Sequence, residues 1–240
     1  MGGTFSMHAE RVVRPLRIFV GDLLDFLYPP LCLLCHQRLD NGADFVCPNC
    51  SSLLKPSAKL TLPADQAGSQ LLHPCRFTLS TAFFSYTPEL QKIIHAFKYQ
   101  GLSRLDAFFE KEILKRWEGV FLAGDCLVPV PLHSARLRER GFNQSEVLGR
   151  LFSRQIGLPC DAGILERVRY TEQQAKLNAE ERRRNVQGAF RVRSRESLMH
   201  RHLVLVDDVL TTGSTLNECA RVLIEAGAGR VDVLTLARVE

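Results

Sequence analysis

Long apolar runs are missing from this 240-residue sequence. A membrane-spanning helix needs about 18 or more consecutive apolar residues, and no segment reaches that length. The apolar stretch 18–27 is interrupted by Asp22 and Asp25 and lacks a small-residue cleavage site, so it does not match a secretory signal. We therefore expect a soluble, cytoplasmic protein.

Two common nucleotide-binding patterns are also missing. The Walker A pattern, in which a glycine-rich loop ends in Gly-Lys-Ser or Gly-Lys-Thr, does not occur. The segment Gly227-Ala228-Gly229 lacks the third glycine and the preceding strand of a dinucleotide-binding fingerprint. A phosphate site in this chain therefore requires a different kind of loop.

The most informative segment is 203–216, which combines a strand, two carboxylates and a loop of small residues. Four consecutive apolar residues, 203–206, favour a strand covered on both faces, as in a parallel sheet flanked by helices. Asp207 and Asp208 follow, and the next loop leads into an amphipathic helix that ends near Gly227. The loop consists of Thr211, Thr212, Gly213, Ser214 and Thr215.

The chemistry of this segment fits a sugar phosphate. The loop supplies backbone N–H donors, hydroxyl groups and a glycine in front of a helix N-terminus, which attracts anions. Two adjacent aspartates can accept hydrogen bonds from neighbouring sugar hydroxyls, each contributing about 1.5 to 3 kcal/mol. For the Asp-Asp pair alone, a solvated turn before a capped helix is the simpler interpretation. The whole segment favours a functional site.

Positive charge is concentrated in one part of the chain. The formal net charge is +5, with 31 Lys and Arg against 26 Asp and Glu. Residues 133–201 hold 15 of the basic and 8 of the acidic residues, a local charge of +7 that leaves −2 elsewhere. Much of the excess is arginine, which is suited to bidentate contacts with phosphate. A polyanionic ligand explains the excess, and so would nucleic acid.

Four cysteines near the N-terminus form two Cys-x-x-Cys pairs separated by eleven residues: Cys32 with Cys35, and Cys47 with Cys50. This spacing is typical of a tetrahedral zinc site, in which four thiolates leave no open coordination position. Two disulfides or a redox-active pair are the alternatives, and the lack of a secretory signal favours the metal. We therefore predict structural Zn²⁺ in a small module that has too little core to fold alone.

The rest of the chain predicts alternating strands and helices. Residues 55–68 indicate a connector, 77–86 a strand or short hairpin, and 126–130 a further strand. Amphipathic helices are expected from Pro88 to near Gly101, over 105–113, and from 147 to near Gly157. Segment 133–144 is expected to form a loop in which Arg136 and Arg140 could meet a pyrophosphate, the alternative being a solvated basic loop.

Segment 206–215 resembles the phosphoribosyl-pyrophosphate (PRPP) binding motif of the type I phosphoribosyltransferases. Further segments resemble, in the same order, the ComF family of competence protein F-like proteins, which carry an N-terminal zinc ribbon. The matching positions are 97–99, 128–133, Arg136, 140–144, Gln174, Leu177 and 184–190, and the resemblance spans about residues 22 to 239.

This resemblance implies a fold class and a division into domains. The fold would be α/β, a type I phosphoribosyltransferase-like parallel sheet flanked by helices, with a small N-terminal zinc-ribbon module. We expect an N-terminal helical extension over 1–28, the zinc ribbon and linker over 29–74, and the phosphoribosyltransferase-like domain over 75–240. Within that domain, the resemblance implies a flap around residues 169–185.

The resemblance also implies how the ligand binds. Asp207 and Asp208 would contact the ribose, and residues 211–215 would hold the 5′-phosphate. PRPP would bind together with Mg²⁺, with Lys98, Arg136 and Arg140 on the pyrophosphate. Arg182 and Arg184 are further candidates to close on this group, and Arg184 is expected to act with the two aspartates in catalysis.

Two functions remain open. The protein could transfer the phosphoribosyl group to an acceptor that the sequence does not identify, in a reaction that needs no covalent enzyme nucleophile. Alternatively, it could be a non-catalytic PRPP-binding accessory factor in DNA uptake or processing, with single-stranded DNA or DNA-uptake and recombination proteins as partners. The sequence does not determine the oligomeric state, although PRPP-binding relatives commonly pair, and a homodimer is the state that this resemblance allows.

Overall fold

The computed structural model describes residues 30–39, 45–67, 74–99, 105–117, 122–171, 178–193 and 198–240. The chain divides into two compact units, Met1–Ser52 and Leu53–Glu240. The helical extension expected over residues 1–28 lies outside the described residues. Within the described ranges, no helix has the length and apolarity needed to cross a membrane.

The first unit contains short elements around its cysteines. An antiparallel bridge joins Leu31 and Arg38, and helix α2 spans Pro48–Ser51. Cys47 precedes this helix in an extended conformation, and its side chain accepts a hydrogen bond from the backbone N–H of Cys50. Pro48 takes the first helical position, where a backbone N–H would have no partner within the helix and its absence is tolerated. The first Cys-x-x-Cys pair therefore lies in a turn, and the second spans the N-terminus of α2.

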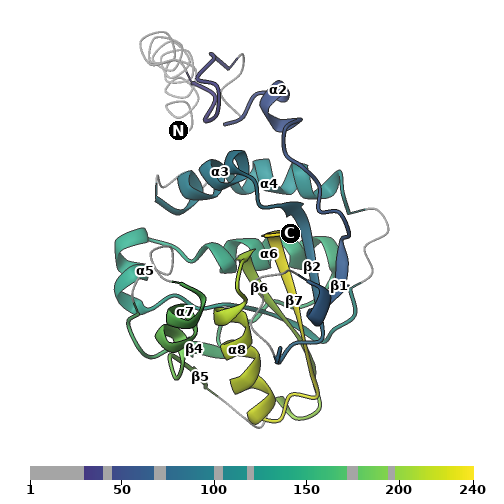
Figure 1. Cartoon of the computed structure of the whole chain (residues 1–240), viewed down its shortest axis with the longest axis vertical. Helices are drawn as coiled ribbons and strands as arrows, with labels where there is room; N and C mark the ends of the chain where they lie inside the picture. The colour runs from purple at the N-terminus through teal and green to yellow at the C-terminus, as the bar shows by residue number, and fades with distance from the viewer. Residues whose placement is uncertain are drawn as a thin grey trace, which may run out of the picture. The chain divides into compact units, whose positions relative to one another are not determined.

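A five-stranded sheet with strand order β1-β2-β7-β6-β3 forms the centre of the second unit (Figure 1). Strand β1 (Thr61–Pro63) pairs antiparallel with β2, and the other neighbouring strands run parallel. The parallel strands are β2 (Leu79–Ser85), β3 (Cys126–Pro129), β6 (His202–Leu210) and β7 (Arg230–Arg238). A mostly parallel sheet flanked by helices confirms the expected fold class.

The remaining elements surround this sheet. Strands β4 (Leu165–Arg167) and β5 (Phe190–Val192) form a separate antiparallel pair. The helices are α3 (Pro88–Tyr99), α4 (Leu105–Leu114), α5 (Ser134–Arg140), α6 (Gln144–Ile156), α7 (Ala179–Val186) and α8 (Ser214–Glu225). The expected helices at 88, 105, 147 and 216 therefore correspond to α3, α4, α6 and α8.

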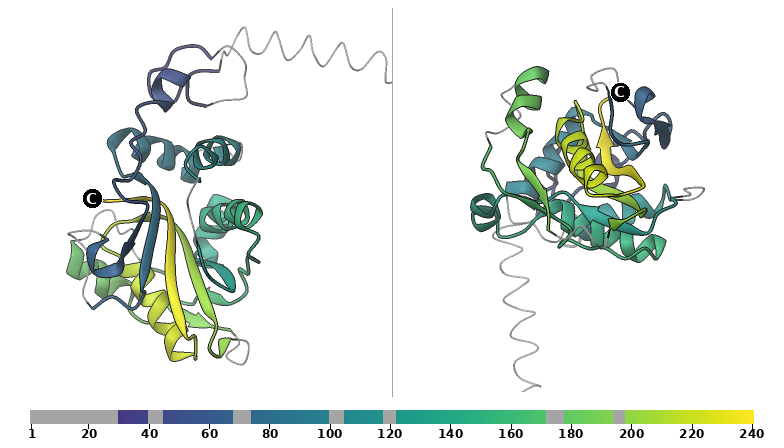
Figure 2. Two further views of the ribbon diagram at one scale, coloured as in Figure 1. Left: turned by 90° about the vertical axis from the view of Figure 1, so that its right-hand side faces the viewer. Right: turned by 90° about the horizontal axis from the view of Figure 1, so that it is seen from below.

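Helices α6 and α8 cover opposite faces of the sheet (Figure 2). Leu203 and Leu205 of β6 belong to one hydrophobic cluster with Leu216 and Leu223 of α8. Alternate residues of a strand point to opposite faces, so the buried Val204 and Val206 face the other side, where α6 packs on β6 and β3. The apolar run in the sequence therefore forms a strand that is buried on both sides.

Helix α3 begins as the sequence predicts. The backbone N–H of Leu90 donates to Thr87 Oγ1 at 3.4 Å, and Pro88 is the first helical residue. The helix buries its apolar face, including Phe97, and ends with Lys98 in its last turn. This arrangement fixes the position from which the Lys98 side chain extends.

Segment 133–144 differs from the expected loop, because it contains the seven-residue helix α5. His133 Nδ1 accepts a hydrogen bond from the backbone N–H of Ala135 at 3.2 Å and caps the helix. Gly141 ends it with a φ of +80°, a conformation that favours glycine. The Arg and Glu residues inside the segment have good helix propensity, and that outweighs the proline and glycine at its borders.

Residues 55–67 are more than the expected connector. Strand β1 pairs with β2, and a 3-10 helix follows at Ala64–Gln66. Ala64 and Ala67 are buried in the same hydrophobic cluster as α8. A short antiparallel strand here satisfies backbone groups along the outer edge of β2, which would otherwise be an unpaired edge. The polar and proline-rich composition of the segment concealed this role.

Candidate functional site

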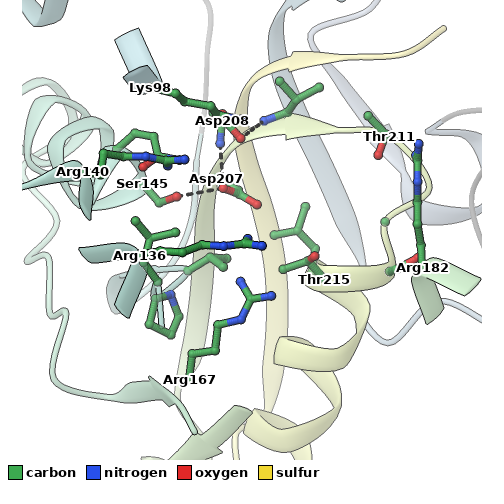
Figure 3. Close-up of a pocket in the computed structure, with 18 of the residues that line it drawn as sticks. Lys98, Arg136, Arg140, Ser145, Arg167, Arg182, Asp207, Asp208, Thr211 and Thr215 are labelled. Atoms are coloured by element: carbon green, nitrogen blue, oxygen red, sulfur yellow. Dashed lines mark hydrogen bonds and ion pairs between the residues drawn. The ribbon is translucent and has the colours of Figure 1, made fainter. Parts of the chain in front are cut away.

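A pocket of about 380 Å³ lies at the carboxyl ends of β3 and β6 (Figure 3). Ligands bind at this end of the strands in open parallel sheets. Its wall comes from the end of β6, the first turn of α8, the β3–α6 connection with α5, and the last turns of α3. The expected site residues that line it are Lys98, Arg136, Arg140, Arg182, Asp207, Asp208, Thr211, Gly213, Ser214 and Thr215.

Asp207 lies where β6 reaches the pocket. Its Oδ1 atom accepts hydrogen bonds from Ser145 Oγ at 2.8 Å and from the backbone N–H of Asp208 at 2.9 Å. Burial and the neighbouring Asp208 charge raise the pKa of Asp207 to about 7, although the Ser145 bond and the Lys98 charge act in the opposite direction. Near neutral pH, this carboxyl group therefore exists in both its neutral and its charged form.

Asp208 is only 6% exposed and forms an ion pair with Lys98 of α3. The Oδ1 atom accepts a hydrogen bond from the backbone N–H of Val209 at 3.0 Å, and Oδ2 faces the ammonium group. Burial lowers the pKa of Lys98, but the Asp208 charge and hydrogen bond outweigh it and raise the pKa overall. Lys98 therefore stays charged and neutralises this carboxylate.

The loop 211–215 turns from β6 into α8. Gly213 has a φ of +69°, which favours glycine, and it directly precedes the first helical residue, Ser214. Thr212 is buried, and its Oγ1 lies 2.8 Å from Ser214 Oγ. It is therefore the one member of this loop that does not line the pocket. The backbone N–H groups in the first turn of α8 lie at the positive end of the helix dipole.

Four arginines line the pocket: Arg136, Arg140, Arg167 and Arg182. The Arg140 guanidinium lies 4.9 Å from the centre of the Tyr99 ring, and its buried Nη1 has no hydrogen-bond acceptor among the described residues. Among the described residues, these arginines and Lys98 give five cationic side chains that face two carboxylates. The pocket therefore has an excess of positive charge and suits a polyanion.

Arg184 does not line this pocket. Its guanidinium pairs with Glu180 at 2.5 Å, and its side chain is 73% exposed. Arg182 of the same helix lines the pocket instead. Residues two apart on a helix point about 200° away from each other, so both cannot face one site. Gln174 and Leu177, which the family resemblance includes, lie outside the described residues.

Ser145 and Arg167 are among the pocket residues that sequence reasoning missed. Asn143 caps α6 by accepting from the Ser145 backbone N–H, and this places the Ser145 hydroxyl against Asp207. Arg167 is the last residue of β4, which lies outside the central sheet. The arginine-rich composition of 133–201 was the only signal for Arg167, and it did not single this residue out.

The four cysteines of the first unit form a cluster. Their sulfur atoms all lie within 4.8 Å of one another. Cys35 Sγ and Cys47 Sγ are 3.8 Å apart, which matches the edge of about 3.8 Å in a tetrahedron with Zn–S bonds of about 2.3 Å. Cys32 Sγ accepts from the Cys47 N–H, and Cys47 Sγ from the Cys50 N–H, each at 3.4 Å. The cluster could hold a metal ion with four sulfur ligands.

The chain is similar to a known protein family and to several known proteins. Residues 143–240 match the family model described as phosphoribosyl transferase domain. The chain is 34% identical over 224 residues to DNA utilization protein YhgH of Escherichia coli (strain K12), covering 88% of this chain and 97% of that protein. It is 30% identical over 221 residues to competence protein F of Haemophilus influenzae, covering 86% of this chain and 96% of that protein. Among solved structures, adenine phosphoribosyltransferase from Leishmania tarentolae matches with a TM-score of 0.34 and 14% identity, covering 60% of this chain and 74% of that chain.

Proposed function

Since the chain belongs to the ComF family, together with competence protein F and DNA utilization protein YhgH, we propose that its pocket binds PRPP with Mg²⁺. We further propose that the protein transfers the phosphoribosyl group to an acceptor. The observation that carries this proposal is the convergence of Asp207, Asp208, the 211–215 loop and several cations on one pocket. A pentose that carries phosphate groups at both ends has the complementary pattern of hydroxyls and negative charge.

Each part of the pocket has a partner in this ligand. The carboxylates of Asp207 and Asp208 would accept hydrogen bonds from the two ribose hydroxyls. The start of α8 would bind the 5′-phosphate through backbone N–H groups, and the loop hydroxyls would add further hydrogen bonds. Arg136, Arg140 and Lys98 would contact the pyrophosphate. The buried Nη1 of Arg140, which has no acceptor among the described residues, would gain one from the ligand.

The residues present fit Mg²⁺ as a partner of PRPP. Aspartate oxygens are the ligands that this cation takes in proteins, usually together with substrate phosphates. When bound, Mg²⁺ would neutralise charge on the pyrophosphate. Asp208 Oδ2 now faces Lys98, so the lysine occupies the position where a cation or a sugar hydroxyl would meet this carboxylate. Release of Lys98 toward the pyrophosphate would leave Asp208 open to either partner.

The chain's own residues support the transfer chemistry through charge. As the bond between C1′ and the pyrophosphate oxygen breaks, negative charge grows on the leaving group, and the arginines stabilise it. C1′ gains oxocarbenium character and bonds to the acceptor atom. Pyrophosphate leaves with the electron pair of the broken bond, and the proton of the acceptor passes to solvent. In this scheme no side chain forms a covalent intermediate. Arg182 takes the place that the sequence assigned to Arg184, because Arg182 lines the pocket.

Isothermal calorimetry with PRPP and Mg²⁺ tests the ligand. We expect binding to the wild type and a loss of about 100-fold for Asp207→Asn, because a carboxylate that accepts a sugar hydroxyl bond contributes about 1.5 to 3 kcal/mol. Asp65→Asn is the matched control, since Asp65 is exposed on the 3-10 helix and does not line the pocket. No binding to the wild type would contradict the proposal.

Turnover needs a separate measurement. Pyrophosphate release is followed with PRPP, Mg²⁺ and a panel of purines, pyrimidines and amines. Release that depends on one acceptor and disappears in Asp207→Asn supports the transferase. Tight PRPP binding without release for any acceptor would instead favour a non-catalytic accessory factor.

The accessory factor is a second candidate because the relatives are named for competence and DNA utilization. Exposed arginines outside the pocket, Arg138 on α5 and Arg183 on α7, offer phosphate contacts. Binding of single-stranded DNA through such contacts weakens steeply as salt rises. Fluorescence anisotropy at about 50 and 200 mM salt tests this role, and an affinity that does not depend on salt would exclude it.

For the first unit, we infer that the four cysteines bind structural Zn²⁺. Their sulfur spacing fits a tetrahedral ion with no open coordination position. Metal analysis of the purified protein should give about one zinc per chain, and Cys35→Ser should reduce it. A protein that is fully oxidised at these cysteines and free of metal would contradict this assignment.

Three further expectations stay predictions: the domain division at 28/29 and 74/75, a cytoplasmic location, and a homodimer. The stable core fragments from limited proteolysis would map the domain borders. Sedimentation of the full chain would give the oligomeric state. Both measurements need only the protein itself.

A further inference from the structure

Arg167 and Arg136 converge on a single residue at the edge of the pocket. The Arg136 Nη2 atom donates to the Thr171 carbonyl at 2.7 Å, and the Arg167 Nη2 atom donates to the Thr171 hydroxyl. Thr171 is 3% exposed. Two guanidinium groups from separate elements, α5 and the end of β4, are therefore held beside each other by one buried threonine.

Within the described residues, the hydrogen-bonding groups of this arginine pair are only partly satisfied. Among the described residues, neither Arg136 nor Arg167 forms an ion pair with a carboxylate, and the buried Nε of Arg167 has no hydrogen-bond acceptor. Burial and then the charge of Arg136 lower the pKa of Arg167. Two cations placed together with an orphaned N–H destabilise the protein unless an anion binds between them.

Other arginines of this protein do have oxygen partners for their guanidinium groups. Arg221 on α8 is held by Glu218 at 2.7 Å and Glu225 at 2.6 Å. Arg238 is 1% exposed, yet its Nη2 donates to Ser57 Oγ at 2.6 Å and also to the Lys59 carbonyl. Elsewhere the fold therefore supplies oxygen partners to arginines, whereas Arg167 faces the pocket with an N–H still available.

We propose that Arg167 is a further ligand-binding residue, and that Arg167 and Arg136 together form a subsite for one phosphoryl group. This inference rests on the proposed function, because the group it binds is part of the PRPP pyrophosphate. In Figure 3, the guanidinium groups of Arg136 and Arg167 point toward the same space, whereas Arg182 lies beside Thr211 on the other side of the pocket.

The choice of the pyrophosphate rather than the 5′-phosphate follows from the partner residue. Arg136 belongs to α5, which follows β3, whereas the proposed site for the 5′-phosphate is at the start of α8. Arg167 acts with Arg136 through Thr171 and therefore belongs to the α5 side. Its planar guanidinium, stacked 5.1 Å from the centre of the Phe190 ring, suits a bidentate contact that a lysine could not reproduce.

Calorimetry on the full chain with three probes tests this subsite: PRPP, inorganic pyrophosphate and ribose 5-phosphate. For Arg167→Gln, we expect pyrophosphate and PRPP to bind about 10- to 100-fold more weakly, and ribose 5-phosphate to change less than about twofold. Arg167→Lys should recover little of the loss. Arg191→Gln is the matched control, because Arg191 lies on the paired strand β5 and forms an exposed ion pair with Glu166.

Thr171→Val is a second variant that keeps both arginines and removes only the hydroxyl that holds Arg167. We expect pyrophosphate to bind a few-fold more weakly in Thr171→Val, with thermal unfolding near that of the wild type. Equal pyrophosphate affinity in the wild type and Arg167→Gln would overturn the inference while leaving the proposed function intact. Weaker ribose 5-phosphate binding alone would overturn the pyrophosphate assignment. No PRPP binding to the wild type would instead contradict the proposed function.

Discussion

The charged residues at the two ends of the central sheet differ in whether their hydrogen-bonding groups have partners. At the amino-terminal edge, where β6 and β7 begin, Asp232 accepts a hydrogen bond from the Leu79 N–H at 3.0 Å and lies 2.8 Å from His202 Nε2. Arg230 pairs with the same carboxylate at 2.9 Å. The His202 N–H in turn donates to Asp125 Oδ2 at 2.7 Å. Both carboxylate oxygens of the 4% exposed Asp232 have partners.

At the carboxyl edge, the same strands end in an incomplete network. Asp207 and Asp208 are neighbours, and the pKa of Asp207 is raised to about 7 by burial and by the second carboxylate. Buried N–H groups of Arg140 and Arg167 have no acceptors among the described residues. One edge of the sheet therefore stabilises the fold, and the other keeps hydrogen-bonding capacity for a ligand.

The largest effect is expected for Asp232→Asn. It removes a buried charge from a satisfied network, so the free energy of unfolding should fall by about 3 kcal/mol. PRPP affinity of the folded protein should stay within about twofold, because Asp232 does not line the pocket. Urea unfolding and calorimetry measure the two quantities. An equal loss of affinity in Asp232→Asn and Asp207→Asn would remove the distinction between the two edges.

The next effect concerns pH and Asp207. The folded-state pKa is about 7 and the ordinary value is about 4, so the folded protein holds a proton that the unfolded chain releases between these values. The free energy of unfolding should therefore fall as pH rises from about 4 to 7. The change should be about 2 kcal/mol, below the roughly 4 kcal/mol of full conversion, because Asp207 is partly exposed in the pocket.

Asp207→Asn should remove this pH-dependent term and unfold at a higher temperature than the wild type at pH 8. The amide oxygen can still accept the bonds that Asp207 Oδ1 accepts from Ser145 and the Asp208 N–H. Thermal unfolding between pH 5 and 8 checks both statements, with Asp65→Asn as control. A variant as pH-dependent as the wild type would mean that Asp207 titrates normally.

These residues also show what the sequence could and could not predict. The strand, the aspartates and the loop lie within fourteen consecutive residues, so their local pattern was sufficient to locate that side of the pocket. The Ser145 bond to Asp207 joins residues 62 positions apart and depends on the path of the chain. Arg167 depends in the same way on a strand outside the central sheet. The sequence did not determine which face of α7 points toward the pocket, and this orientation explains why Arg182 rather than Arg184 lines it.

A smaller effect should come from the ion pair between Lys98 and Asp208 at the carboxyl edge. A double-mutant cycle with Lys98→Gln and Asp208→Asn should give a coupling energy of about 1 to 2 kcal/mol. Either single variant leaves an unpaired charge in the pocket. The double variant should therefore lose less free energy of unfolding than the sum of the two single losses. A coupling energy near zero would mean that the ion pair with Lys98 does not stabilise the fold, and that Asp208 belongs with the groups available to a ligand.

The smallest effect is expected for Thr212→Val. This variant tests whether one loop contains separate stabilising and ligand-binding residues. The Thr212 hydroxyl bonds Ser214 Oγ at 2.8 Å in a buried setting, so its loss should lower the free energy of unfolding by about 1 kcal/mol. Thr212 does not line the pocket, whereas Thr211 does. PRPP affinity should therefore stay within about twofold in Thr212→Val and fall several-fold in Thr211→Val. If Thr212→Val lost as much affinity as Thr211→Val, the buried hydroxyl pair would be setting the loop geometry on which phosphate binding depends, and stabilising and ligand-binding groups would not be separable at this edge.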